Sequence, residues 1–108
     1  MIIDWRKRTT AADKQHQQDA ADYQAWKVAR QQAVDAITVE VGGLVFDGDE
    51  DSQNRMARAV AAADLMTDTT EWILADNTIA MVSVQTLKIA CRLAGEEQTR
   101  IWNEGRPA

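Results

Sequence analysis

The sequence predicts an α+β domain in the order α-ββ-α-ββ-α, with a long N-terminal helix and two β-hairpins forming a small antiparallel sheet that helices cover. Three observations support this. A long stretch without Gly or Pro comes first, two pairs of short β-rich runs each flank a turn sequence, and an amphipathic stretch follows each pair. Segregated helices and antiparallel strands are typical of α+β domains. With 108 residues, 45% of them apolar, the chain has the size and composition of one globular domain.

The first helix is predicted at residues 10–36, because Thr9-Thr10 offers an N-cap and helix-favouring Ala, Gln and Lys are frequent after it. Large apolar side chains recur at helical spacing only from Tyr23 onward. A helix of this length runs roughly 40 Å, whereas a compact domain of ~100 residues has a radius of gyration of about 13 Å. We therefore expect four segments: an arm at 1–9, a single domain at 10–104, a projecting polar part of its first helix at 10–24, and a tail at 105–108.

The first hairpin is predicted around Gly42-Gly43, since a two-residue Gly-Gly loop favours a primed turn whose twist matches the flanking strands. That turn sets Val41 opposite Leu44 and Val39 opposite Phe46. Side chains alternate along a strand, so these four share one face. A two-stranded ribbon is marginal in water, and helices or further strands must cover this apolar face.

The second hairpin is predicted at residues 70–75 and 78–82, around an Asp76-Asn77 turn. A two-residue loop there pairs Leu74 with Ile79 and Trp72 with Met81, which again places large apolar side chains on one face.

Two further helices follow the hairpins. Asp51 or Ser52 is expected to cap the first of them and Ser83 the second, which ends near Trp102. The side chains expected to face inward are Met56, Ala59, Val60 and Ala63 in the first, and Val84, Leu87, Cys91, Ala94 and Ile101 in the second. We also expect Trp26, Trp72 and Trp102 in the core, whereas Trp5 has no place in this architecture.

The composition and charge of the chain exclude several classes of function. No run approaches the roughly 20 apolar residues that span a bilayer, and residues 1–8 lack the apolar region of a signal peptide, so the protein is expected in the cytoplasm when made. The lone Cys91 and lone His16 exclude a Cys/His metal set. A net charge of -5 disfavours nucleic-acid binding as a global property. No nucleophile with a base beside it stands out, and we expect neither enzymatic activity nor a cofactor.

The acidic turn is the one motif that suggests a metal. Asp47, Asp49 and Asp51 reproduce the first three ligand positions of an EF-hand calcium loop, but the sixth position is Ser52 rather than Gly and the twelfth is Arg58 rather than Glu. Acidic residues before a helix N-terminus are favoured by the helix dipole, which gives the cluster a structural explanation. These three residues are therefore weak metal candidates.

Two stretches resemble a known family. VGGLVFDGDE with the following SQ and RMARA, and EWILADN, lie within a similarity that covers about Ala25 to Trp102. The chain resembles an uncharacterised domain family found in tail and tail-fibre-associated proteins of tailed bacteriophages and prophages. The resemblance implies a virion-associated structural role in multi-copy, often trimeric assemblies, with no established catalytic residues to transfer.

The resulting hypothesis is a non-enzymatic structural or protein-interaction module of a phage or prophage tail. Its expected partners are copies of itself, with a trimer as one form, and other tail proteins, but neither nucleic acid nor a membrane. It would be made in the host cytoplasm and then join the virion tail. The residues expected to contact partners are Trp5, Gln15, Gln18 and Asp22.

Three alternatives remain open. One is a tail-fibre assembly chaperone that is not retained in the virion. Another is a calcium-dependent binding module that uses the acidic turn. The third is a small regulatory protein that binds nucleic acid through Arg6, Lys7 and Arg8.

Overall fold

The structure, a computed structural model, describes residues 11–105, and side chains from residue 14 onward. The predicted arm at 1–9, with Trp5 and the three basic residues, lies outside the described range, as do residues 106–108.

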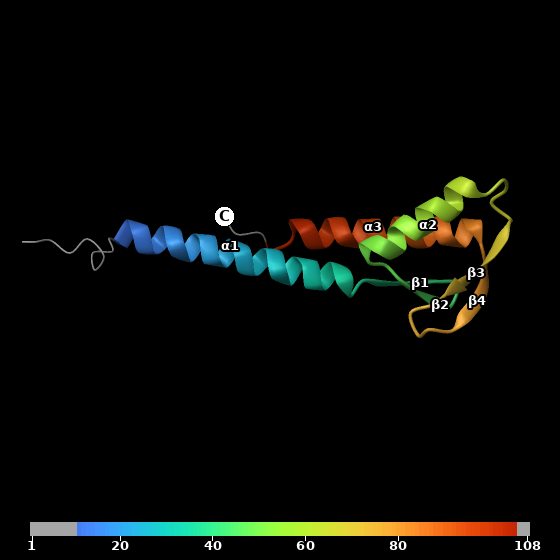
Figure 1. Cartoon of the computed structure of the whole chain (residues 1–108), viewed down its shortest axis with the longest axis horizontal. Helices are drawn as coiled ribbons and strands as arrows, with labels where there is room; N and C mark the ends of the chain where they lie inside the picture. The colour runs from blue at the N-terminus through green and yellow to red at the C-terminus, as the bar shows by residue number, and fades with distance from the viewer. Residues whose placement is uncertain (1–10, 106–108) are drawn as a thin grey trace, which may run out of the picture.

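The predicted element order is confirmed (Figure 1). The elements are α1 (Ala11–Asp35), β1 (Thr38–Val41), β2 (Leu44–Asp47), α2 (Glu50–Ala62), β3 (Thr69–Ile73), β4 (Ile79–Ser83) and α3 (Val84–Asn103). The long first helix was predicted to within one residue at its C-terminal end, because Ala36 still donates to helical carbonyls before the chain turns into β1.

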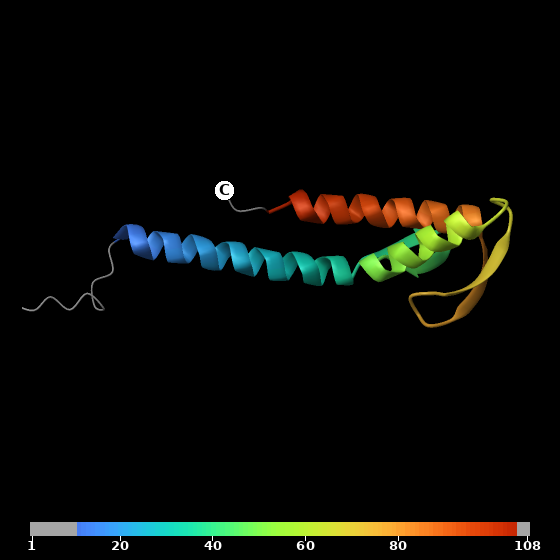
Figure 2. The ribbon, with the colours of Figure 1, turned by 45° about the horizontal axis from the view of Figure 1, so that its top comes forward.

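The molecule is elongated, with extents of 80 × 23 × 21 Å. Its radius of gyration is 21.8 Å, well above the ~13 Å of a compact domain of this size. Helices α1 and α3 run antiparallel side by side, and the N-terminal part of α1 extends beyond the end of α3 (Figures 1 and 2). Every described side chain from 14 to 25 is exposed. Hydrogen bonds between residues four apart, such as Gln15 Nε2 to Asp19 Oδ1 at 2.8 Å, support this exposed part of the helix.

The first hairpin has the predicted register, with Val41 paired to Leu44 and Val39 to Phe46. Gly42 and Gly43 form its loop with φ values of 60° and 82°. Both values lie in the left-handed region that a type I′ turn requires. Phe46 is fully buried, whereas Val45 on the other face is exposed. The face assignment from strand alternation is therefore correct.

The second hairpin differs from its predicted register by one residue. Ile73 pairs with Ile79 and Trp72 with Ala80. The chain turns through three residues rather than two, since Leu74 N donates to Thr78 O at 2.8 Å and Asn77 takes a φ of 67°. Such a loop of a turn plus one left-handed residue adds one position to the connection. A one-residue shift moves a strand's side chains to the opposite face, so the prediction that Ile79 and Met81 face the interior is wrong.

The two hairpins do not join into one sheet, which corrects the predicted single antiparallel sheet. Strands β1 and β2 form one two-stranded sheet and β3 and β4 another. A backbone bond from Ala75 N to Val45 O, at 3.0 Å, links the loop of the second hairpin to β2.

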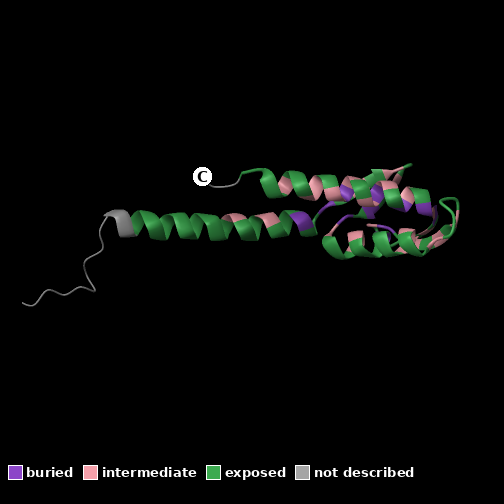
Figure 3. Cartoon of the chain, turned by 90° about the horizontal axis from the view of Figure 1, so that it is seen from above, coloured by how far each residue is buried: buried purple, intermediate pink, exposed green. Residues whose placement is uncertain are grey.

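The core lies between the first hairpin, α2 and α3, with inward residues of the second hairpin closing it (Figure 3). Its buried side chains are Phe46, Met56, Leu74, Val82, Leu87 and Ala90. A smaller cluster of Val34, Ile37 and Ala94 attaches the C-terminal end of α1. Trp26 and Trp72 are only half-buried, and Trp102 is exposed. The prediction of a core Trp102 is therefore wrong, because α3 extends beyond the core and Trp102 packs instead against Arg30 of α1.

The helix starts agree in part with the sequence. Ser83 caps α3 as predicted, with its hydroxyl accepting from Thr86 N at 3.1 Å. Helix α2 begins earlier than expected, at Glu50, with Asp49 in the N-cap position. Asp49 accepts a hydrogen bond from the Ser52 hydroxyl instead of from the backbone, so neither predicted capping residue takes that position.

Candidate interaction surfaces

The three aspartates of the acidic turn lie on different elements. Asp47 ends β2, Asp49 precedes α2 and Asp51 lies in its first turn, and the carboxylate of Asp49 is held by Ser52. Within residues 11–105 no group of three or more His, Cys, Asp or Glu side chains is placed to hold a metal ion. The three aspartates are close in the sequence, yet among the described residues they do not form a cluster of this kind.

Cys91 is a half-buried thiol on α3. Its Sγ lies 3.6 Å from Gln53 O, to which it donates. Burial raises the pKa of Cys91 above its ordinary value, which keeps the thiol protonated at neutral pH and unsuited to nucleophilic attack.

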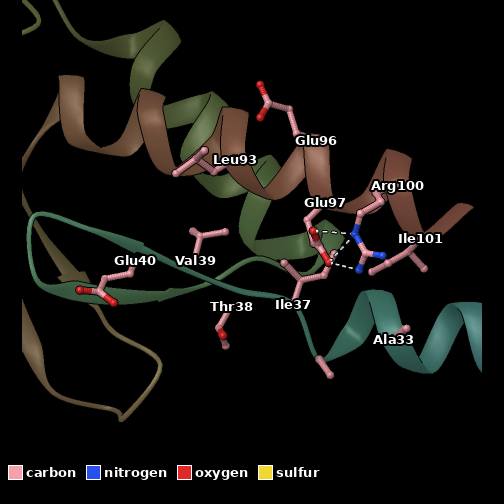
Figure 4. Close-up of a pocket in the computed structure, with 11 residues that line it drawn as sticks. Ala33, Ile37, Thr38, Val39, Glu40, Leu93, Glu96, Glu97, Arg100 and Ile101 are labelled. Atoms are coloured by element: carbon pink, nitrogen blue, oxygen red, sulfur yellow. Dashed lines mark hydrogen bonds and ion pairs between the residues drawn. The ribbon is translucent and has the colours of Figure 1, made fainter. Parts of the chain in front are cut away.

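A groove of about 660 Å³ runs between the α1–β1 connection and α3 (Figure 4). Its apolar lining comes from both sides. Val39 lies on β1, whereas Leu93 and Ile101 lie on α3. Val39 and Ile101 also pack against the buried cluster of Val34, Ile37 and Ala94. The remaining lining residues are Ala33, Ala36, Ile37, Thr38, Glu40, Glu96, Glu97 and Arg100.

The rim of this groove is acidic. Three carboxylates line it, those of Glu40, Glu96 and Glu97, together with the guanidinium of Arg100. Glu96 also pairs with Arg92, at 3.8 Å, just outside the lining. Arg100 is already committed, because its Nε lies 3.1 Å from Glu97 Oε2 and a terminal nitrogen pairs with Glu104. The Arg100 side chain lowers the pKa of Glu97 below its ordinary value. The groove thus presents negative charge beside an apolar floor.

An aromatic clasp, consisting of Trp26, Arg30 and Trp102, holds the last turn of α3 against α1. The Arg30 guanidinium lies 4.7 Å from the Trp26 ring centroid and 5.0 Å from that of Trp102. Trp26 Nε1 also donates to Glu104 O at 3.2 Å. The sequence singled out Trp26 and Trp102 but not Arg30. The position of Arg30 in its helix gives no sign that a ring from another helix covers it.

The outward face of the second hairpin carries three large exposed apolar side chains. Ile73, Ile79 and Met81 have exposed fractions of 62%, 67% and 61%. Ile73 and Ile79 are directly paired across the strands, and Met81 is paired with exposed Glu71. We call Ile73, Ile79 and Met81 the hairpin face. Sequence reasoning missed it, because the predicted register turned two of its three members inward.

The partner-contact residues expected on α1 lie along its projecting part. Gln15 and Gln18 bond to Asp19 and Asp22 respectively, each at 2.8 Å, and all are exposed. They are accessible, yet their amides and carboxylates already satisfy one another within the helix. The structure does not bring them near the groove or the hairpin face.

One family comparison gives a match. The model described as "Domain of unknown function (DUF4376)" covers residues 16–106, from the first turns of α1 to beyond α3. No curated protein and no solved structure matches the chain. In the described part of the chain, no helix is both long and apolar enough to cross a membrane. Because the family match spans well over half of its residues, the chain belongs to this family, DUF4376.

Proposed function

We propose that this protein is a non-enzymatic interaction module that binds another protein through the hairpin face, within a phage or prophage tail assembly. The observation that carries the proposal is the exposure of Ile73, Ile79 and Met81 on one side of a two-stranded ribbon. Adjacent large apolar side chains left in water are typical of surfaces that a partner covers. The tail setting comes from the sequence resemblance described above, and the elongated shape is compatible with a multi-copy structure.

The ribbon itself supports this function. A two-stranded sheet is marginally stable alone, and within residues 11–105 β3 and β4 pair with each other and with no other strand. A partner that covered the hairpin face would stabilise the ribbon and remove apolar area from water, at about 25 cal/mol per Å². The opposite face already packs on the core through Leu74 and Val82, so the ribbon is positioned before a partner arrives.

The proposal is tested in a phage or lysogen that encodes this chain. Ile73→Asn/Ile79→Asn should reduce the number of complete tails seen by electron microscopy, while the purified variant keeps its helical circular dichroism and melting temperature. Leu65→Asn is the matched control, because Leu65 is 62% exposed but lies in the α2–β3 loop, away from the hairpin face. Normal tails with a folded double variant would refute the proposal.

Mass spectrometry of the purified particle separates the structural role from the chaperone. A structural module is present in the particle in multiple copies. A chaperone is required for tails to form but is absent from the finished particle.

A further inference from the structure

We propose that the acidic groove between α1, β1 and α3 binds residues 1–8 of a second copy of this chain. The inference concerns a different surface from the hairpin face and rests on the proposed function only in that the module acts in several copies. It assigns the partner of the groove as an apolar and basic segment with the sequence MIIDWRKR.

The chemistry of the two sides is complementary. The groove lining includes the apolar side chains of Val39, Leu93 and Ile101 together with three carboxylates and one guanidinium, which leaves the lining with a net negative charge. Glu97 pairs with Arg100 and Glu96 with Arg92, so Glu40 is the lining carboxylate that no described ion pair holds. Residues 1–8 consist of four apolar residues, three consecutive basic residues and one aspartate. Opposite net charges on the two surfaces steer and orient association, and the apolar residues Ile2, Ile3 and Trp5 fit a floor of aliphatic side chains.

Chain geometry excludes the same contact within one molecule. The groove begins near Ala33, and α1 separates Ala33 from Ala11 by 22 residues, roughly 33 Å at 1.5 Å per residue. An extended chain covers at most ~3.6 Å per residue, so Trp5 reaches about 22 Å from Ala11, and Arg6 to Arg8 reach less. These residues can therefore enter a groove only on a second copy.

An antiparallel arrangement of two α1 helices would bring each segment to its groove. The face of α1 opposite the clasp carries exposed residues at alternating three- and four-residue steps, namely Gln18, Ala21, Ala25, Val28 and Gln32. Two of these side chains, those of Ala21 and Ala25, are small and permit a second helix to approach closely in the middle of this face. Two antiparallel α1 helices place the N-terminal end of each beside the C-terminal end of the other, where the groove lies. The resulting contact is two-fold and closed.

Charge exchange on the full chain tests this. The rim variant is Glu40→Lys/Glu96→Lys, and the segment variant is Arg6→Glu/Lys7→Glu/Arg8→Glu. Glu40 and Glu96 are exposed and take no part in the core or in the Glu97–Arg100 pair, although Glu96 pairs with Arg92 on the surface of α3. By sedimentation velocity the unmodified chain should have twice its monomer mass of 12.0 kDa at high concentration. Each variant alone should remain at the monomer mass, because its segment and groove repel.

An equimolar mixture of the two variants should return to twice the monomer mass, since both of its segment–groove contacts then join opposite charges. The control variant Asp64→Lys/Glu71→Lys makes the same charge change at exposed positions outside the groove and should associate like the unmodified chain. A monomeric unmodified chain, variants that associate alone, or a mixture that stays monomeric would each overturn the inference.

Disulfide trapping identifies the contact itself. With Cys91→Ser in every chain, a chain with Ile3→Cys mixed with a chain with Leu93→Cys should yield a covalent heterodimer under mild oxidation, whereas Ile3→Cys mixed with Asn54→Cys, exposed on α2, should not. Equal trapping at both positions would contradict docking in the groove. These outcomes do not depend on the hairpin face. If Ile73→Asn/Ile79→Asn reduced the number of tails but no disulfide formed, the groove inference would be refuted and the proposed function would stand.

Discussion

The guanidinium of Arg30 on α1 lies over the ring of Trp102 on α3, 5.0 Å from its centroid, although 72 positions separate the two in the chain. Trp26 covers the guanidinium from within α1, at 4.7 Å. The buried cluster of Val34, Ile37 and Ala94 anchors only the C-terminal end of α1. The clasp therefore aligns the preceding turns of α1 with the last turns of α3.

Arg30→Ala should lower the free energy of unfolding by about 1–2 kcal/mol, because it removes cation–π contacts and the packing of the aliphatic stem. The change should also raise the hydrogen-exchange rates of the amides at residues 99–104. Urea unfolding followed by circular dichroism measures the first effect independently of tryptophan emission.

Lys27→Ala is the matched control for the clasp. Its ammonium lies 4.8 Å from the Tyr23 ring, within the same helix, so its loss should cost under ~0.5 kcal/mol. It should leave exchange in α3 unchanged. Equal effects of the two substitutions would show that the clasp does not hold the helices together.

The register of the second hairpin buries Val82 and leaves Ile79, on the same strand, exposed. Val82→Ala should destabilise the protein by about 2 kcal/mol, because Val82 is 3% exposed and its loss leaves a cavity. Ile79→Ala should cost under ~0.5 kcal/mol, because Ile79 is 67% exposed. The register that the sequence predicted would reverse this order, and urea titrations of both variants decide between them.

The contrast between the hairpins shows how far the sequence reached. Gly42-Gly43 admits few alternatives, since two adjacent glycines between β-rich runs specify the loop length and thereby the register. Asp76-Asn77 is ambiguous, because Asn also adopts the left-handed conformation as the last residue of a longer loop. Asn77 does so here, with φ at 67°. Because the loop is one residue longer than predicted, the opposite face of β4 is exposed, and the prediction therefore missed the hairpin face.

The candidate surfaces show a similar limit. Helical spacing located the apolar stripes of α2 and α3 correctly at Met56 and Leu87, both fully buried. Spacing does not report where a helix outlasts its core, which is why Trp102 was expected inside. The groove combines α1, β1 and α3, and no local pattern shows that Glu40 and Glu96 line the same depression.

Two glycines in different settings should respond oppositely to alanine. A Cβ on Gly48 would lie 2.6 Å from Ile37 Cγ2 and 3.0 Å from Ala94 Cβ, so Gly48→Ala overpacks the junction of α1 with the core. It should destabilise by about 1–3 kcal/mol. Gly95→Ala meets only Gln53 Oε1 at 3.8 Å. As a helix-interior substitution it should stabilise by about 0.5–1 kcal/mol. Thermal or urea unfolding measures the stability of both variants. An unchanged stability of Gly48→Ala would show that the junction is not tightly packed.

The ion pair between Glu97 and Arg100 in the groove lining should depend on pH. The Arg100 side chain hydrogen-bonds Glu97 and lowers the pKa of that carboxyl from its ordinary value of 4.5. A carboxyl with a lowered pKa in the folded state stabilises the fold above its unfolded pKa, and this contribution is lost as the pH falls through the lowered value. Arg100→Gln should therefore raise the pKa of Glu97 toward 4.5, as followed by the carboxyl ¹³C shift during acid titration.

Arg92→Gln provides the comparison for that titration. Arg92 pairs with Glu96 at 3.8 Å on the same helix, so this substitution removes an equal charge nearby without removing a hydrogen bond to Glu97. The pKa of Glu97 should then stay low. If both substitutions raised it equally, the general positive charge of α3, rather than the bonded Arg100, would be what holds Glu97 ionised at the rim.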